Sequence, residues 1–195
     1  MMHVVFGITA GVLSFVAYPI YIADILRGET KPNRVTWWVL ALLNGALSAA
    51  YYASGARDTI WIPLSYTLGF TVVALLSFKY GEGGWKRTDS VIFLGAVISL
   101  VAWWLLQSAE IALYLIIATD LTGLAPTILK TYRRPWTESK FSWTVAFIAS
   151  AINILAIEQW RPAISLYPMY VAITNGIIVL FIYFPRFAKP HNDRS

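Results

Sequence analysis

Long apolar stretches constrain this chain more than any other feature. Seven of them follow one another with short connections, at residues 4–26, 36–54, 60–79, 90–107, 110–131, 141–157 and 162–185. A helix of about 20 residues crosses a hydrocarbon layer roughly 30 Å thick. Hydrophobic residues make up 58% of the 195 positions and charged residues only 13%. The sequence therefore predicts an all-α membrane protein with seven transmembrane helices in a lipid bilayer.

The basic residues are distributed unequally between the two sides of such a protein. Only Arg57 and Arg161 fall on one side. The other thirteen of the fifteen lie in alternate connections and in the C-terminal tail: Arg27, Lys31, Arg34, Lys79, Lys86, Arg87, Lys130, Arg133, Arg134, Lys140, Arg186, Lys189 and Arg194. Because cytoplasmic segments are enriched in Lys and Arg, we expect an outside N-terminus and a cytoplasmic C-terminus, in the plasma membrane. This topology accounts for the net charge of +5 without a nucleic-acid partner.

Two stretches of the sequence resemble each other. Residues 19–32 are PIYIADILRGETKP and residues 126–139 are PTILKTYRRPWTES. The matched pairs are Pro19 and Pro126, Thr30 and Thr137, Trp37 and Trp143, and Pro63 and Pro168, at offsets of 107, 107, 106 and 105 residues. Shared hydrophobicity of membrane helices is the alternative explanation, but it does not account for the matched proline, threonine and tryptophan positions.

This repeat predicts a domain organisation. Residues 1–88 form a first triple-helix repeat, residues 89–108 a linker helix, and residues 109–195 a second triple-helix repeat with a short cytoplasmic tail. A unit of three helices reverses its orientation on repeating, so the linker helix makes the two bundles parallel. One chain then supplies both halves of a pathway, and both a monomer and a homo-oligomer are compatible with it.

The repeated stretch resembles the PQ-loop repeat of SWEET sugar transporters and cystinosin-like transporters. The resemblance is carried by a proline at the end of an apolar stretch, a basic segment, and a threonine followed by Lys or Glu. Ile20 and Thr127 stand where that family has its glutamine. The resemblance implies the 3+1+3 helix order. It also implies a transporter that moves a small polar solute, such as a sugar, an amino acid or a related metabolite, by alternating access.

The paired prolines and tryptophans are candidates for moving parts. A proline inside a helix removes one backbone hydrogen bond and leaves a kink, so Pro19 and Pro126 are candidate hinges. Trp37 and Trp143 match across the repeat and are candidates for a cytoplasmic gate. Shaping of a helix by proline, and anchoring of tryptophan at the membrane interface, are the alternatives.

Asp120 is an acid in the middle of the fifth apolar stretch. An ionised carboxylate at that depth costs several kcal/mol, so it requires a cavity or a partner. Removal from water favours the protonated form, which makes Asp120 a candidate for proton coupling. The segment Thr119 to Gly123, TDLTG, is also similar to the D-x-T-G of cystinosin-like proteins, where the resemblance implies that the aspartate couples transport to protons. A structural aspartate is the alternative.

Three asparagines and two hydroxyl residues are the candidates for substrate binding. Asn44, Asn153 and Asn175 fall within about two turns of mid-membrane, and amides suit hydroxyl, amide or carboxylate groups of a solute. SWEET-like pockets similarly use asparagines of the third and seventh helices; Asn175 fits this pattern, whereas the third stretch offers Tyr66 and Thr71. Hydrogen bonding between helices is the alternative role.

Other classes of protein fit the sequence less well. The chain has no cysteine, and its two histidines, His3 and His191, lie near its ends, so we predict no metal site and no cofactor. The last apolar stretch lacks the lysine that a retinal protein requires. No arrangement of nucleophile and base indicates an enzyme. A seven-span receptor or binding protein of the same fold, without transport, is the alternative function.

Overall fold

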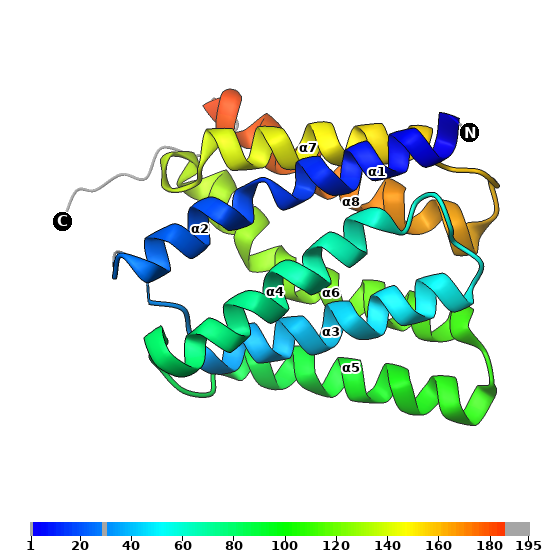
Figure 1. Cartoon of the computed structure of the whole chain (residues 1–195), viewed down its shortest axis with the longest axis horizontal. Helices are drawn as coiled ribbons and strands as arrows, with labels where there is room; N and C mark the ends of the chain where they lie inside the picture. Colours follow the sequence, from blue (N-terminus) through cyan, green and yellow to red (C-terminus); the bar gives the residue numbers. More distant parts are fainter. Residues whose placement is uncertain (1, 29–30, 186–195) are drawn as a thin grey trace.

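The computed structural model describes residues 2–28 and 31–185, and the basic tail residues Arg186, Lys189 and Arg194 lie outside the described part. The described chain is helical, without a β-strand (Figure 1). Its elements are α1 (Met2–Phe15), α2 (Ala17–Leu26), α3 (Arg34–Ala53), α4 (Trp61–Tyr80), α5 (Arg87–Leu106), α6 (Ala109–Arg133), the short 3₁₀ helix η1 (Pro135–Thr137), α7 (Lys140–Leu155) and α8 (Pro162–Tyr183).

Four of these helices, α4, α5, α6 and α8, are long and apolar enough to cross a membrane. Helices α1 and α7 are also apolar but shorter. Each apolar stretch of the sequence lies on a helix, and the first lies on two. The length and composition of the helices are those of a membrane protein.

The first apolar stretch differs from the single helix expected over residues 4–26. It is divided at Val16 into α1 and α2. Pro19 has no N–H to donate to the carbonyl of Phe15, four residues earlier, and the first helix ends at Phe15. The N–H of Val16 bonds instead to the carbonyl of Leu13, at 3.2 Å, which tightens the chain there. Pro126, in contrast, lies inside an unbroken α6.

Side-chain caps define where two corresponding helices begin. The side chain of Asn33 accepts a hydrogen bond from the N–H of Thr36 at 3.0 Å, at the start of α3. Ser139 does the same for the N–H of Ser142 at 3.2 Å, at the start of α7. Such caps satisfy backbone donors that the first turn leaves unpaired. The two caps are 106 residues apart, the same offset as Trp37 and Trp143.

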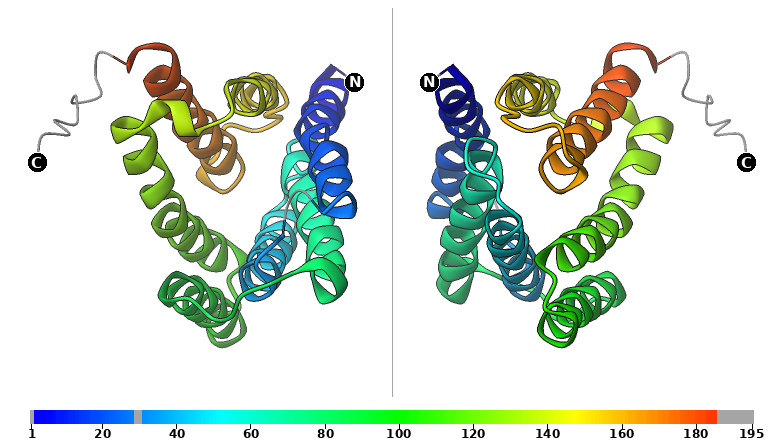
Figure 2. Two further views of the ribbon diagram at one scale, coloured as in Figure 1. Left: turned by 90° about the vertical axis from the view of Figure 1, so that its left-hand side faces the viewer. Right: turned by 90° about the vertical axis from the view of Figure 1, so that its right-hand side faces the viewer.

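Apart from α5, the long helices pack as two groups, α1, α3 and α4 with the short α2 beside them, and α6, α7 and α8. Helix α4 contacts both α1 and α3, and α8 contacts both α6 and α7. We call α1–α4 the first half and α6–α8 the second half. The halves meet where α1 contacts α7 and where α3 contacts α6, and α5 packs on α3 and α6 (Figure 2). The contacts correspond when α1 is exchanged with α6, α3 with α7 and α4 with α8. The contact of α1 with α4 then corresponds to that of α6 with α8, that of α3 with α4 to that of α7 with α8, and that of α1 with α7 to that of α3 with α6.

The bundle has two distinct sides. The N-terminal side, at the right in Figure 1, holds the start of α1 and the connections 54–60, 107–108 and 156–161. The C-terminal side, at the left, holds the connections 31–33, 81–86 and 134–139. A single parallel bridge between Asn33 and Glu82 joins two connections of the C-terminal side.

Helix α1 approaches α4 closely at the N-terminal side. Gly7 of α1 lies against the carbonyl of Asp58, so a Cβ atom there would overlap that carbonyl. Gly11, one turn later, lies against Trp61 in the same way. Crowding varies at the C-terminal side, where a Cβ atom on Gly81 would overlap the carbonyl of Ser77 but one on Gly84 would have no atom within 4 Å. Close approach of α1 to α4 therefore depends on residues without a side chain.

Candidate functional site

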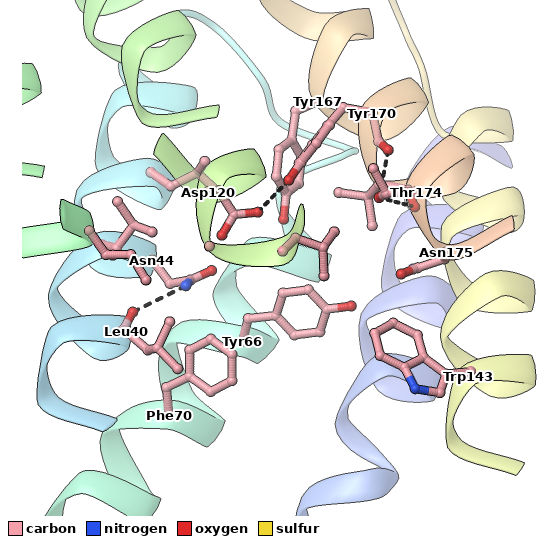
Figure 3. A pocket seen from close by; sticks show the side chains of 16 residues that line it. Leu40, Asn44, Tyr66, Phe70, Asp120, Trp143, Tyr167, Tyr170, Thr174 and Asn175 are labelled. Atoms are coloured by element: carbon pink, nitrogen blue, oxygen red, sulfur yellow. Dashed lines mark hydrogen bonds between the residues drawn. The ribbon is translucent and has the colours of Figure 1, made fainter. Parts of the chain in front are cut away.

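A cavity of about 260 Å³ lies between the two halves (Figure 3). This is close to the lower limit of ligand pockets, which is roughly 300 Å³. Its polar lining comprises Asn44, Tyr66, Asp120, Trp143, Tyr167, Tyr170, Thr174 and Asn175. Its apolar lining comprises Leu40, Leu43, Leu47, Phe70, Ile92, Gly123, Leu124 and Val171. Both halves and α5 therefore contribute to the site.

Asp120 is the charged residue of this lining. The hydroxyl of Tyr170 donates a hydrogen bond of 2.7 Å to its Oδ2 atom, which joins α8 to α6 across the cavity wall (Figure 3). The other carboxylate oxygen, Oδ1, has no protein donor among the described residues. The Oδ1 atom of Asp120 is therefore left to accept a hydrogen bond from a solute.

The two asparagines of the cavity are held by backbone carbonyls. The Nδ2 atom of Asn44 donates to the carbonyl of Leu40 at 3.1 Å. The Nδ2 atom of Asn175 donates to the carbonyl of Ala146 at 3.3 Å, and also lies 3.4 Å from the hydroxyl of Ser150. A bond within α3 therefore fixes the orientation of the Asn44 amide, and bonds from α8 to α7 fix that of Asn175.

Aromatic rings form much of the remaining wall. Tyr66 and Phe70 stack on one face of α4, with ring centroids 5.9 Å apart and an interplanar angle of 17°. Trp37 packs behind Phe70 at 5.4 Å. Trp143 lies on the opposite wall, and its indole N–H donates to Glu138 at 2.9 Å (Figure 3). The indole is thereby held at the end of the cavity nearest the C-terminal side.

Five of the residues predicted from the sequence line the cavity: Asn44, Tyr66, Asp120, Trp143 and Asn175. The others lie elsewhere. The hydroxyl of Thr71 donates to the carbonyl of Thr67 at 2.7 Å, on its own helix. Asn153 is fully buried near the N-terminal side, where its amide donates to the carbonyl of Thr59 at 3.4 Å.

The remaining three predicted residues belong to the C-terminal side. Trp37 stands outside the cavity lining, behind Phe70. Pro19 lies on α2, three residues after the break at Val16. Pro126 is exposed on α6 and lies beside Lys130 and a surface depression.

Three polar residues of the lining were not predicted from the sequence: Tyr167, Tyr170 and Thr174. They precede Asn175 by eight, five and one residues, and the spacing of 167, 170 or 171, and 174 places them on one face of α8. A search back from Asn175 in steps of four residues reaches Tyr167 but not Tyr170 or Thr174, which lie in a neighbouring row of the same helix.

The cavity is covered on one side more than on the other. Toward the N-terminal side its lining includes Leu47 and Tyr167, which are each 2% exposed. Toward the C-terminal side it is lined by Phe70, Leu124 and Trp143, which are only partly buried. The approach to Asp120 and the two amides is therefore less obstructed from the C-terminal side.

Hydrogen bonds join the two halves at the N-terminal side. The hydroxyl of Tyr51 donates to the carbonyl of Ile164 at 2.6 Å and lies 2.7 Å from the hydroxyl of Thr59. The N–H of Arg57 donates to Glu158 at 3.0 Å. The guanidinium of Arg161 donates to the carbonyl of Ser54 and to Glu110, the latter at 3.1 Å.

Polar contacts described at the C-terminal side stay within one half. In the first half, Arg34 donates to the carbonyls of Ser77 and Gly81, at 3.2 and 3.3 Å. In the second half, Glu138 pairs with Lys130 and accepts from the indole of Trp143. Around the less obstructed approach to the cavity, these contacts therefore join helices and connections of the same half.

The two halves contribute unlike residues at corresponding positions of the cavity. Phe70 of α4 and Asn175 of α8 both line it and are 105 residues apart, the offset that also separates Pro63 from Pro168. The second half thus supplies an amide where the first half supplies a phenyl ring.

Comparison with protein-family models, with curated proteins and with solved structures finds no match to the chain. Within residues 2–28 and 31–185, no group of three or more His, Cys, Asp or Glu side chains is arranged to hold a metal ion. The cavity and the contacts around it are therefore the evidence on function.

Proposed function

We propose that this chain is a membrane transporter that moves a small polar solute by alternating access, with the central cavity as its solute site. The observation that supports this most directly is the position of the cavity. It lies between two halves that are bonded to each other on one side of it, whereas on the other side the polar contacts described stay within each half. Exchange of these two arrangements would move access to the cavity from one side of the membrane to the other.

The proposal includes seven spans in the 3+1+3 order, with a PQ-loop-like repeat on each side of the linker helix α5. Two findings support it: the interhelical contacts that correspond between the halves, and the caps that begin α3 and α7 at an offset of 106 residues. With thirteen of fifteen basic residues on the C-terminal side or in the tail, we place that side in the cytoplasm and the N-terminus outside the plasma membrane. The structure then corresponds to a state with its cavity accessible from the cytoplasm.

We further propose that transport is coupled to protons through Asp120. This carboxylate is the charged group of the cavity lining, and Tyr170 holds it at the junction of α6 and α8. A proton that binds and leaves there would change the charge of the cavity between the two access states.

The test begins with a thermal-shift screen of small polar metabolites, since a ligand that binds the folded state raises the melting temperature. Compounds that bind are then followed as labelled solutes in liposomes containing the full chain. We expect saturable uptake, and accumulation in response to a pH gradient that a protonophore abolishes. Asn175→Ala should reduce uptake, whereas Thr71→Ala, outside the cavity lining, should not. Binding without flux would instead identify a receptor or binding protein of the same fold.

A further inference from the structure

We infer that the solute is a small organic cation that carries an ammonium group. The inference rests on the proposed function, because it takes the central cavity as the transport site, and it narrows the range of solutes to one class. It is based on which hydrogen-bonding atoms of the cavity are already used by the protein and which are left for a ligand.

Three of the four amide N–H groups of the two cavity asparagines are bonded to the protein, two from Asn175 and one from Asn44. A backbone carbonyl can only accept a hydrogen bond, so the partners Leu40 and Ala146 require the nitrogen atoms of Asn44 and Asn175 to face the helices. The oxygen atoms of both amides are then on the cavity side, as Figure 3 shows. Thr174 is similar, because its hydroxyl donates to the carbonyl of Tyr170 at 2.8 Å. These side chains therefore present hydrogen-bond acceptors to a ligand.

Asp120 adds a charged acceptor to this set. Its Oδ2 atom is bonded to Tyr170, and its Oδ1 atom is left for a ligand. No Lys or Arg lines the cavity in the described part of the chain, and the other titratable lining groups are the tyrosines Tyr66, Tyr167 and Tyr170. An ammonium group can donate three hydrogen bonds, and it neutralises a carboxylate that would otherwise be isolated from any counter-charge.

The aromatic wall suits the same ligand. Tyr66, Phe70, Tyr167 and Trp143 surround the space beside Asp120 and the amides. Cations are attracted to the faces of aromatic rings, and the interaction strengthens when water is excluded. The rings also pack against the apolar part of an amine.

Other solutes match this arrangement less well. A carboxylate would meet Asp120 and two amide oxygens, with only tyrosine hydroxyls and one N–H of Asn44 as available donors. A sugar needs several donors as well as acceptors around its hydroxyl groups, and three of the four amide N–H groups are already used. A proton and an ammonium group would also occupy Asp120 in turn, so the coupling we propose becomes an exchange of one for the other.

The test uses three probes with similar skeletons and different charge: phenethylammonium, 2-phenylethanol and 3-phenylpropionate. Each is titrated by isothermal calorimetry against the full chain in nanodiscs of zwitterionic lipid. We expect saturable binding of the cation and at least roughly tenfold weaker binding of the alcohol and the carboxylate, as expected for the loss of a hydrogen bond to a charged group. Equal or tighter binding of either of these two would overturn the inference. This comparison needs no variant.

A second measurement addresses Asp120 directly. Asp120→Asn should weaken binding of phenethylammonium by roughly tenfold to a hundredfold. Glu82→Gln is the matched control, because Glu82 is an exposed acid that pairs with Lys31 at the C-terminal side, and it should keep the wild-type affinity. Unchanged affinity in a folded Asp120→Asn chain would contradict the inference.

The two proposals can fail separately. If the cation binds but no labelled cation crosses liposomes, the solute class stands and transport does not. If instead a neutral or anionic solute is transported and the cation does not bind, transport stands and the solute class is wrong.

Discussion

Hydrogen bonds at the N-terminal side of the bundle connect the two halves, and those described at the C-terminal side connect each half to itself. Two bonds of the first set are buried, from Tyr51 to the carbonyl of Ile164 and from Asn153 to the carbonyl of Thr59, whereas those of Arg57 and Arg161 are exposed or partly buried. Exposed groups carry much of the second, such as the pair of Lys31 and Glu82 at 3.8 Å. A buried hydrogen bond contributes about 1 kcal/mol, and an exposed ion pair about 0–1 kcal/mol.

This difference in bonding indicates on which side the two halves separate more easily. Separating the halves at the N-terminal side would break two buried hydrogen bonds, expose their polar groups, and break the bonds from Arg57 to Glu158 and from Arg161 to Ser54. Separating them further at the C-terminal side would leave the internal contacts of each half unchanged. If the chain alternates between two access states, the bonds of the N-terminal side therefore set much of the free-energy difference between the states.

The largest expected effect is on access to the cavity from the two sides. The chain has no native cysteine, so Thr174→Cys introduces a single thiol into the cavity. A water-soluble maleimide should label it from the C-terminal side of oriented vesicles and label it much less from the N-terminal side. Adding Arg161→Ala, which removes the bond to Ser54, should increase labelling from the N-terminal side, by roughly fivefold for each 1 kcal/mol of bonding lost.

A control and a contradicting result are available for this labelling. Leu68→Cys lies on the outward face of α4, where Leu68 is 61% exposed, and lipid should protect it from both sides. Equal labelling of Thr174→Cys from both sides would contradict the difference in access between the N-terminal and C-terminal sides.

The next effect concerns packing. Gly7→Ala would place a methyl group into the carbonyl of Asp58 and should lower the free energy of unfolding by about 1–3 kcal/mol. Gly84→Ala adds the same group in open space at the C-terminal side and should change stability by about 0.5 kcal/mol or less. Thermal unfolding in detergent measures both, and similar melting temperatures for the two variants would contradict the difference in crowding between these two glycines.

A smaller effect is expected from hydroxyl groups. Tyr51→Phe removes the donor to the carbonyl of Ile164 and should destabilise the chain by about 1–2 kcal/mol. Thr144→Ala removes an exposed bond of 3.1 Å to Tyr183, within the second half, and should cost about 0.5 kcal/mol or less. Denaturant titrations of the two variants give the comparison, and an equal loss would show that burial does not separate the two sides.

The smallest expected effect concerns the hinge prolines and depends on the proposed transport. Pro19→Ala restores an N–H that can bond to the carbonyl of Phe15, worth about 1 kcal/mol, and should slow solute exchange roughly fivefold with little change in equilibrium binding. Pro126→Ala should slow exchange less, because α6 is already continuous there. Counterflow in liposomes measures the rates, and equal losses of binding and exchange would indicate that the prolines only shape the cavity.

Much of the helical structure and part of the cavity could be predicted from the sequence. Asn44, Asp120 and Asn175 stood out because a polar side chain within an apolar stretch requires a cavity or a partner. Tyr170 and Thr174 did not, because tyrosine and threonine are also common at membrane interfaces and in helix contacts. Their role depends on the helix face that carries them.

The depth of a residue in the membrane and the continuity of a helix were harder to predict. Asn153 was placed near mid-membrane by counting residues, but α7 ends at Leu155, so Asn153 lies in its last turn beside the N-terminal side. Pro19 and Pro126 have the same sequence context, yet one follows a break and the other lies in an unbroken helix. Helix ends and kinks depend on neighbouring helices, which a single apolar stretch does not specify.

The pairing of Phe70 with Asn175 has a consequence for how such a site can evolve. Two identical three-helix chains assembled about a symmetry axis must present the same residue twice, so the two walls of their site are the same. Once both units are joined in one chain through α5, each can mutate alone. An amide on one wall and a phenyl ring on the other can then hold an unsymmetrical molecule in a single orientation.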